Sequence, residues 1–267
     1  MSKVILITGA SRGMGKATGE HLAGKGYKVY GTARRPENYA NHPFPLIKMD
    51  LEDEAGIENA IRHVVELEGR IDVLINNAGR GMMSPLEETP TDDLKKIFQT
   101  NVFGSVKAIQ TALKYMRKQN NGLIIQITSV AGFLGLPFRG GYSASKSAIM
   151  IMIESLRYEL SGTGIDIVDV CPGDIVTGIS ENRIYARLDE KSPYFEIFSV
   201  MRRKADEEVN QGLPAHRIAV IIDEIITAKH RKPRYIVAPF LQRIMPLVKV
   251  LLPAKVFERL IKNHYKI

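Results

Sequence analysis

One stretch near the N-terminus indicates the fold: Val4-Ile-Leu-Ile-Thr8-Gly9-Ala-Ser-Arg-Gly13-Met-Gly15. Consecutive apolar residues are typical of a parallel strand that is buried on both faces. The three glycines follow directly and open a helical pattern over residues 13–25. Such a turn lets the backbone approach a phosphate at the N-terminus of a helix. The spacing G-x-x-x-G-x-G therefore predicts a nucleotide site at the first strand–helix turn.

Apolar strands and helical patterns alternate along most of the chain. This alternation predicts an α/β fold with a doubly wound parallel sheet, in a single Rossmann-like domain over residues 1–238. Residues 178–213 break the rhythm, and we interpret them as an insertion that covers the site. We expect strands at 4–8, 28–32, 46–49, 72–76, 123–128, 165–170 and 234–237, and helices at 13–25, 55–67, 92–117, 142–160 and 215–229.

Composition narrows the class of protein. The chain has 267 residues, of which 45% are hydrophobic, and a single cysteine, Cys171. No intrachain disulfide can form, which is consistent with a reducing compartment. The N-terminal apolar run is too short for a signal peptide, and no uncharged apolar stretch of about 18 residues exists. We expect a cytoplasmic protein.

The positive charge is concentrated at the C-terminus. Residues 229–267 hold ten Lys/Arg and one acid, Glu258, for a net +9, whereas the other residues hold 27 basic and 28 acidic side chains. This favours a local anionic partner over a general nucleic-acid surface. Residues 239–267 are predicted to form a basic amphipathic helical tail, with Pro246 and Pro253 each opening a short helix. Either the tail packs on the body or on a neighbouring subunit, or it lies on an anionic membrane.

A second motif carries chemistry. Tyr142 and Lys146 are four residues apart and share one face of a helix. An ammonium beside a phenol favours the phenolate, and such a pair can exchange a proton with an alcohol oxygen while a cofactor moves the hydride. Ser129 ends a strand thirteen residues earlier and can hydrogen-bond a carbonyl. No metal site is expected, because neither the histidines nor the acids have ligand spacing.

Arginines mark the predicted ribose end of the nucleotide site. An acid at the end of the second strand is usual for NAD. Here Arg34 and Arg35 take its place, and Arg12 lies in the glycine turn. Guanidinium groups suit a 2′-phosphate, so we expect NADP(H), with Arg12 and Arg34 as the phosphate pair.

Together these motifs resemble the short-chain dehydrogenase/reductase family over residues 3–177. The resemblance rests on the glycine turn, Asp50, Asn76-Asn-Ala-Gly79, Asn101, Ser129, Tyr142-x-x-x-Lys146 and Pro172-Gly-Asp-Ile-Val-Thr177. It implies a catalytic tetrad of Asn101, Ser129, Tyr142 and Lys146, with Tyr142 as the proton donor in reduction. It also implies that Lys146 contacts the nicotinamide ribose, Asp50-Leu51 the adenine, and Ile175 and Thr177 the carboxamide side. The implied cofactor-binding residues are Gly9, Ser11, Arg12, Gly13, Met14, Gly15, Arg34, Arg35, Asp50, Leu51, Asn77, Ala78, Gly79, Tyr142, Lys146, Pro172, Gly173, Ile175 and Thr177.

The resemblance suggests an NADP(H)-dependent oxidoreductase that interconverts a ketone and a secondary alcohol. The loop Phe133–Phe138, with Met82 and Met83, is expected to line an apolar pocket, which favours a steroid-like or long-chain lipid substrate, as in hydroxysteroid dehydrogenase-like and ketosphinganine reductase-like members. A ketoacyl-carrier-protein or sugar/polyol reductase stays open. A non-catalytic NADP-binding sensor ranks lower, because the Tyr/Lys pair is kept. We also expect a homo-oligomer through helices 92–117 and 142–160, where Ile149, Met150, Met152 and Ile153 add apolar surface.

Overall fold

The computed structural model describes residues 2–176 and 183–267. Within these residues, a seven-stranded sheet runs in the order β11-β7-β6-β4-β1-β2-β3, and every neighbouring pair is parallel. The strand order reverses direction at β1, which places a crevice at the carboxyl ends of β1 and β4. The strands are β1 Val4–Ile7, β2 Lys28–Ala33, β3 Leu46–Lys48, β4 Val73–Asn76, β6 Gly122–Ile127, β7 Ile165–Pro172 and β11 Arg234–Val237.

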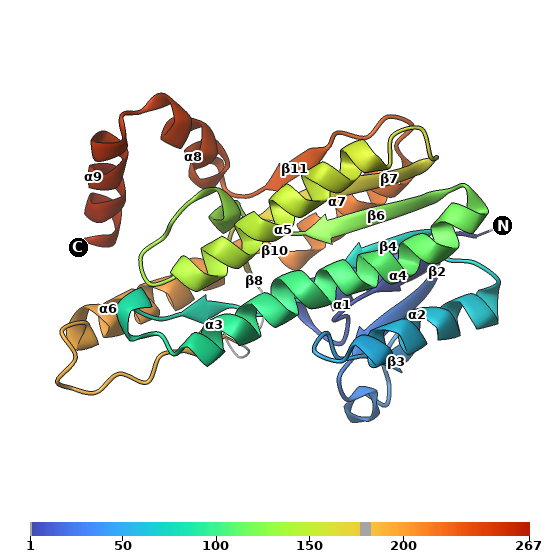
Figure 1. Cartoon of the computed structure of the whole chain (residues 1–267), viewed down its shortest axis with the longest axis horizontal. Helices are drawn as coiled ribbons and strands as arrows, with labels where there is room; N and C mark the ends of the chain where they lie inside the picture. Colours follow the sequence, from blue (N-terminus) through green and yellow to red (C-terminus); the bar gives the residue numbers. More distant parts are fainter. Residues whose placement is uncertain (1, 177–182) are drawn as a thin grey trace.

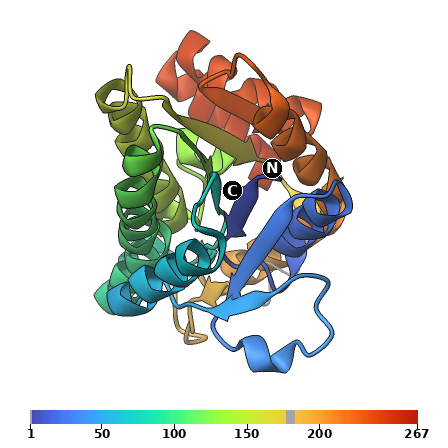
Figure 2. The ribbon, with the colours of Figure 1, turned by 90° about the vertical axis from the view of Figure 1, so that its right-hand side faces the viewer.

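Helices cover both faces of this sheet (Figure 2). On one face, α2 (Glu54–Glu68), α4 (Gly104–Gln119) and α5 (Gly140–Glu159) bury apolar residues against the strands. On the other face, α1 (Gly13–Gly24) and α7 (Ala215–Thr227) do the same. The structure therefore confirms the predicted doubly wound α/β fold. Single-turn helices lie at η1 Pro36–Asn38, η2 Leu86–Glu88 and η4 Val130–Phe133.

The prediction of one continuous helix over 92–117 is wrong, because the helix is interrupted. It consists of α3 (Thr91–Phe98), a π-helical turn η3 (Gln99–Phe103) and α4. Asn101 lies in the π turn and is almost fully buried. Its side-chain amide makes three hydrogen bonds outside the helix, and these hold the residue inward where the turn is wider. π turns of this kind are frequent at functional sites.

The insertion is attached to the body by two short parallel strand pairs. β9 (Ile184–Tyr185) pairs with β5 (Met82–Met83), and β10 (Leu213–Pro214) pairs with β8 (Ile175–Val176). Between them, α6 (Phe195–Asn210) lies at the end of the molecule toward which the strands point (Figure 1). Of the predicted insertion 178–213, residues 178–182 lie outside the described part of the chain.

The tail forms two helices, α8 (Phe240–Leu251) and α9 (Ala254–Tyr265). Pro239 and Pro253 precede them, so the expectation for Pro253 agrees with the structure. The expectation for Pro246 is wrong, because Pro246 lies inside α8. A proline there removes the hydrogen bond to the carbonyl of Gln242 four residues earlier. None of the helices in the two described ranges is long and apolar enough to cross a membrane.

The tail packs on the body along one side. Met245, Val248 and Leu252 of α8 join an apolar cluster with Phe133 and Ile236. The apolar residues of α8 are therefore divided between two sides: Val248 and Leu252 face the body, whereas Phe240 and Leu247 are exposed.

The apolar residues expected at a subunit contact on α5 also need correction. Ile149 and Ile153 are buried within the subunit against the sheet, and Met150 is buried beside Gly132 of η4. Met152 is exposed as expected, and Ile151 is exposed beside it. The exposed large apolar residues of α5 are thus Ile151, Met152 and Tyr158.

Candidate active site

The glycine turn has the geometry that its spacing predicts. Gly9 and Gly13 have φ of +64° and +58°, the left-handed region that favours glycine. A Cβ on Gly15 would lie 2.5 Å from the carbonyl oxygen of Gly9. The loop can close tightly onto the start of α1 only because these positions carry no side chain.

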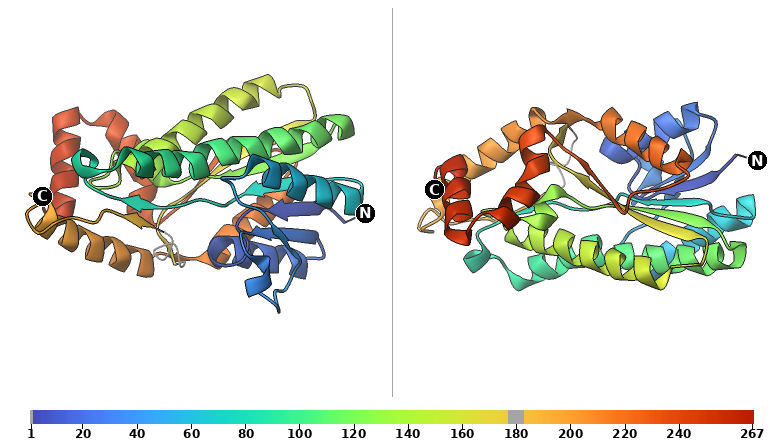
Figure 3. Two further views of the ribbon diagram at one scale, coloured as in Figure 1. Left: turned by 60° about the horizontal axis from the view of Figure 1, so that its bottom comes forward. Right: turned by 90° about the horizontal axis from the view of Figure 1, so that it is seen from above.

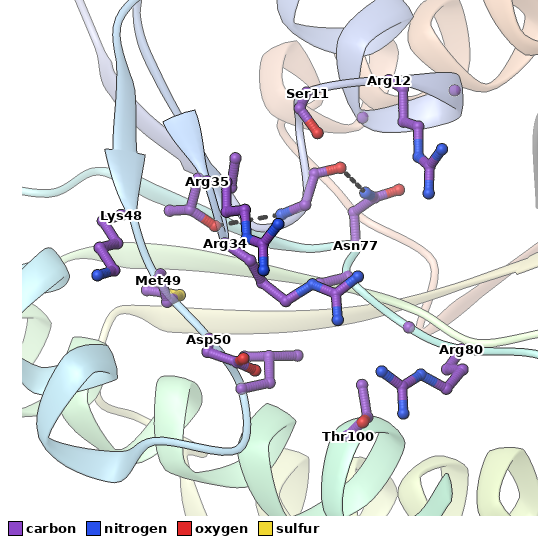
Figure 4. Close-up of a pocket in the computed structure, with 18 of the residues that line it drawn as sticks. Ser11, Arg12, Arg34, Arg35, Lys48, Met49, Asp50, Asn77, Arg80 and Thr100 are labelled. Carbon is purple, nitrogen blue, oxygen red and sulfur yellow. Dashed lines mark hydrogen bonds between the residues drawn. The ribbon is translucent and has the colours of Figure 1, made fainter. Parts of the chain in front are cut away.

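Residues after β4 hold this loop in place. The hydroxyl of Thr8 accepts hydrogen bonds from the backbone N–H groups of Asn77 and Ala78, each at 2.9 Å. The side-chain amide of Asn77 in turn donates to the carbonyls of Thr8 and Gly9 at 2.9 and 3.1 Å, the second of which is drawn in Figure 4. The carboxyl ends of β1 and β4 therefore form one rigid edge.

A cleft of about 820 Å³ opens along this edge. Figure 4 shows Ser11, Arg12, Arg34 and Arg35 around it, with Asp50 on its far side. The predicted cofactor residues that line it are Gly9, Ser11, Arg12, Gly13, Met14, Gly15, Arg34, Arg35, Asp50, Leu51, Asn77, Ala78 and Gly79.

Sequence reasoning missed several lining residues. Lys48 ends β3, Arg80 follows the Asn-Asn-Ala-Gly motif, and Thr100 comes from the π turn. Arg80 carried a signal in its position directly after that motif, whereas Lys48 and Thr100 carried none. With Lys48 and Arg80, the cleft gathers five cationic side chains, which come from the glycine loop, from the end of β3 and from the residues after β2 and β4. This donor set, the bare glycine loop and the cleft volume fit a phosphate-rich nucleotide.

Asn101 and Lys146 meet at Gly79. A Cβ on Gly79 would lie 3.3 Å from Asn101 Oδ1 and 3.4 Å from Lys146 Nζ. Asn101 is fixed by Arg80, whose N–H donates to Oδ1 at 2.8 Å and whose carbonyl accepts from Nδ2 at 2.9 Å. Nδ2 also donates to Ser145 Oγ at 3.0 Å, which links the π turn to α5.

Tyr142, Ser129 and Lys146 lie beside this point. The Tyr142 phenol hydrogen-bonds Ser129, whose Oγ also accepts from the N–H of Ala131 at 3.1 Å. Lys146 Nζ lies 6.0 Å from the centre of the Tyr142 ring and donates to the carbonyl of Ile127 at 3.1 Å. The four residues of the expected tetrad are thus brought together from η3, the end of β6 and α5.

The pKa values of Tyr142 and Lys146 differ from what their spacing in the sequence suggests. Desolvation is the largest influence on Tyr142 and raises its pKa, while the Ser129 hydrogen bond, Arg139 and Arg183 act in the opposite direction. Desolvation likewise lowers the pKa of Lys146 to about 8. The phenol is therefore protonated at neutral pH rather than a phenolate, which suits it to give a proton.

Comparison with known proteins identifies the family of this chain. Residues 3–187 match the family model described as short chain dehydrogenase. The chain belongs to the short-chain dehydrogenase family. It is therefore an oxidoreductase of the class that uses a nicotinamide cofactor to interconvert carbonyl and alcohol groups.

Relatives of this short-chain dehydrogenase include enzymes named for lipid substrates. It is 34% identical to 3-ketodihydrosphingosine reductase of Bacteroides thetaiotaomicron, over 99% of this chain and 98% of that protein. It is 32% identical to NADPH-dependent 3-dehydrocapnine reductase of Ornithobacterium rhinotracheale, over 88% and 87%.

Solved structures show the same fold. A short-chain dehydrogenase from Streptomyces avermitilis superposes with a TM-score of 0.81 at 27% identity, over 99% of this chain and 96% of that one. One from Burkholderia phymatum, in complex with NAD, superposes with 0.80 at 27% identity, over 97% and 95%.

The last predicted cofactor segment of this short-chain dehydrogenase follows β7. The carbonyl of Pro172 accepts from Ser129 Oγ at 3.4 Å, which joins the segment to the tetrad. Gly173 lies against the tail, since a Cβ there would meet Ala238 and the side chain of Gln242. Ile175 is buried in β8. Thr177 lies outside the described residues. Pro172, Gly173 and Ile175 do not line the 820 Å³ cleft, nor do Tyr142 and Lys146.

One apolar cluster of this dehydrogenase joins the loop before α5 to the insertion. Met83 and the loop residues Leu136 and Phe138 pack with Phe198 and Met201 of α6. The expected apolar loop and the insertion thus meet in one cluster, which Tyr265 of α9 also joins.

Asp166 and Asp169 in β7, and Asp174 after it, do not form a metal site with other described residues. Among the described residues, no cluster of three His, Cys, Asp or Glu side chains could hold an ion. Asp169 is fully buried and instead accepts hydrogen bonds from Thr128 Oγ1 at 2.5 Å and Arg234 Nε at 2.7 Å. Asp169 therefore ties β6, β7 and β11 together beneath the site.

Proposed function

We propose that this short-chain dehydrogenase uses NADPH to reduce the 3-keto group of a long-chain amino ketone, with 3-ketodihydrosphingosine as the representative substrate. The observation that carries the proposal is the convergence of Tyr142, Lys146, Ser129 and Asn101 beside Gly79, which lines the nucleotide-sized cleft. The names of the two relatives, which match nearly the full chain, support the substrate class.

Tyr142 is the proposed proton donor. A bound reduced nicotinamide supplies the hydride to the carbonyl carbon. As that carbon is reduced, the oxygen gains negative charge and takes the phenolic proton. Ser129 already hydrogen-bonds the phenol, so a carbonyl oxygen at this position is within reach of both hydroxyls. The raised pKa of Tyr142 keeps the proton available at neutral pH.

Lys146 and Asn101 act around the phenol. Lys146 Nζ gives one of its three N–H groups to Ile127, which leaves two for the ribose hydroxyls of the cofactor. Its positive charge stabilises the phenolate that Tyr142 becomes after the transfer. Asn101 holds the backbone of Arg80 and the side chain of Ser145, and so fixes the relative position of the cleft wall and α5.

The ribose end of the cleft supports the choice of NADP(H). Arg12 and Arg34 are the proposed 2′-phosphate partners, and Lys48 faces the same cleft. No carboxylate occurs in β2, where an NAD-preferring site usually ends with one. The remaining proposed contacts are the glycine loop with the diphosphate, Asp50 and Leu51 with adenine, and the segment from Pro172 to Ile175 with the nicotinamide.

Two features of this part of the protein, one apolar and one charged, favour an amphiphilic substrate. The apolar cluster of Met83, Phe138 and Phe198 suits an alkyl chain. Charged groups also lie near the phenol, since Arg139, Arg183 and Asp174 are all close enough to influence its pKa. An acid near the reacting carbon fits an ammonium group on the neighbouring carbon.

Oxidation of NADPH against a substrate panel tests the proposal. The panel contains 3-ketodihydrosphingosine, a steroid ketone, a ketoacyl thioester and a ketose. We expect the highest kcat/KM for the sphingoid ketone. Highest efficiency with the thioester or the ketose would move the function to those alternatives, and no turnover with any member, despite cofactor binding, would favour the sensor.

The assembly is part of the same proposal. We infer a homo-oligomer whose contact includes the exposed Phe103, Ile151 and Met152 on the side of η3, α4 and α5. Light scattering of wild type and of Ile151→Glu tests it, since the variant should give a smaller species.

A further inference from the structure

Helix α8 is apolar on two opposite sides. Met245, Val248 and Leu252 cover the body. The opposite side carries Phe240, Leu247, Val250 and Leu251, which are between 62% and 81% exposed. Their spacing of seven, ten and eleven residues from Phe240 places them on one face. A single exposed leucine is ordinary, but four large apolar residues on one helix face indicate a surface that meets a partner.

Helix α9 also exposes apolar residues on one side. Val256 and Leu260 are exposed and four residues apart, whereas Phe257 and Tyr265 of the same helix are buried against the body. The exposed apolar surface therefore extends over both tail helices. We name the set Phe240, Leu247, Val250, Leu251, Val256 and Leu260 the tail face.

Cations surround the tail face. Arg243, Lys255, Arg259 and Lys262 are all exposed, and Glu258 is the one acid in residues 239–267. An exposed apolar face flanked by Lys and Arg is the pattern of helices that lie in the headgroup region of an anionic bilayer. We propose that α8 and α9 dock this protein on an anionic lipid surface, with the tail face entering the boundary between headgroups and acyl chains.

The charges favour a bilayer over a second copy of the chain. A two-fold contact through the tail face would bring the Arg243 and Lys255 of one copy close to the same cations of the other. Like charges repel at such a contact, and the tail offers a single acid to offset them. Lipid phosphates and carboxylates supply the opposite charge over the whole surface.

The docked position suits the reaction. Figures 1 and 3 show α8 and α9 at the end of the molecule that also holds α6 and the carboxyl ends of the strands. The Lys249 side chain donates to the carbonyl of Phe133, at the start of the apolar loop. Docking through the tail face would therefore hold the substrate side of the proposed reductase close to its lipid. The docking does not depend on the proposed function, because it rests on the tail alone.

Vesicle flotation of the full-length protein tests the proposal. Wild type is mixed with vesicles of phosphatidylserine and phosphatidylcholine, or of phosphatidylcholine alone, at low and high salt. We expect flotation with the anionic vesicles, weakened by salt. The double variant Leu247→Glu with Val250→Glu should reduce the partition coefficient by about tenfold or more, since each side chain loses its burial in the bilayer.

A matched control separates this effect from a general one. Leu67→Glu changes a leucine that is 58% exposed on α2, far from the tail along the chain, and should float as wild type does. A second variant, Arg243→Gln with Lys255→Gln, should weaken flotation while keeping the apolar residues. Circular dichroism establishes that each variant is folded.

Three results would overturn the proposal. The first is that wild type does not float with anionic vesicles at low salt. The second is that the Leu247/Val250 variant floats as well as wild type. The third is that, without vesicles, light scattering gives a smaller species for this variant than for wild type. The last result would identify the tail face as a subunit contact. Flotation needs neither cofactor nor substrate, and reduction of a water-soluble ketone needs no membrane, so failure of docking and failure of the proposed function are distinguishable.

Discussion

Gln242 of α8 and Asp174 of the segment after β7 are joined by two hydrogen bonds across 68 residues of sequence. The N–H of Asp174 donates to Gln242 Oε1 at 2.9 Å, and Gln242 Nε2 donates to the Asp174 carboxylate. Gly173 lies against the same side chain. The tail therefore supports the segment that the family resemblance assigns to the nicotinamide end of the cofactor.

Substitution of Gln242 should impair cofactor use without unfolding the protein. Gln242→Ala removes both hydrogen bonds, and we expect kcat/KM for NADPH to fall about tenfold. Gln242→Glu should be more damaging, since it places a carboxylate beside that of Asp174. Steady-state kinetics and cofactor titration measure both, with Gln211→Ala as the control. Unchanged cofactor affinity and rate in Gln242→Ala would show that the contact is structural alone.

Tyr142→Phe should abolish turnover and keep cofactor binding. The ring and its packing remain while the transferable proton is lost, so kcat should fall by about 10²-fold or more. Tyr158→Phe, an exposed tyrosine on the same helix, is the control and should be fully active. Activity of Tyr142→Phe near that of wild type, with each ketone of the panel, would refute the tetrad assignment.

The cofactor preference should depend on the arginines at the ribose end. Two guanidinium–phosphate contacts supply about 2–4 kcal/mol, which corresponds to a clear preference for NADPH over NADH. Arg34→Ala should lower kcat/KM with NADPH at least about tenfold and leave NADH nearly unaffected. Arg35→Ala should have the smaller effect. Equal efficiencies of wild type with the two cofactors would contradict the prediction.

The rate of reduction should fall on the alkaline side of neutrality. Lys146, with a pKa of about 8, is positively charged below that pH and neutral above it. Since the reaction needs the ammonium, kcat/KM should be level below about pH 7 and decline above about pH 8. In Lys146→Arg the guanidinium stays charged, so the decline should move to higher pH while the rate at pH 7 is reduced. If kcat/KM of Lys146→Arg declines at the same pH as that of wild type, the decline comes from the titration of another group.

Asp169 should matter for stability rather than for chemistry. Asp169→Ala removes the shortest contacts of Thr128 and Arg234 and leaves them the longer ones to Val170 and Glu154. We expect the free energy of unfolding to fall by about 2–3 kcal/mol. Asp166→Ala removes an exposed ion pair with Arg231 and should change it by less than about 0.5 kcal/mol. Urea unfolding of both variants makes the comparison. If both variants lose the same free energy of unfolding, burial does not make the contact of Asp169 with Arg234 stronger than the exposed ion pair.

Local patterns were enough to predict the sheet and the nucleotide edge. The strands are nearly continuous apolar runs, and the glycine turn has a spacing that few other turns require. The same holds for Tyr142 and Lys146, because four residues on a helix fix their common face. These features depend on short segments of chain, so they can be read without knowing the rest.

Features that depend on long-range contacts could not be predicted. The π turn forms around Asn101, whose partners Arg80 and Ser145 are 21 and 44 residues away. The protonated phenol depends on desolvation by burial in the folded chain, which a sequence pattern does not measure. Pro246 was misplaced because a proline is usual at a helix start, and only the packing of α8 on Phe133 shows that the helix continues past it.

The π turn sets a limit on engineering this enzyme for stability. Deletion of one residue from Gln99–Phe103, such as Thr100, would let α3 and α4 merge into a regular helix with a complete α-helical hydrogen-bond ladder. The same deletion would rotate one helix relative to the other by about 100°. Asn101 would then turn away from Arg80 and Ser145. The uninterrupted helix would be more stable. The protein would lose, however, the contacts of the Asn101 amide that join the cofactor cleft to the catalytic helix.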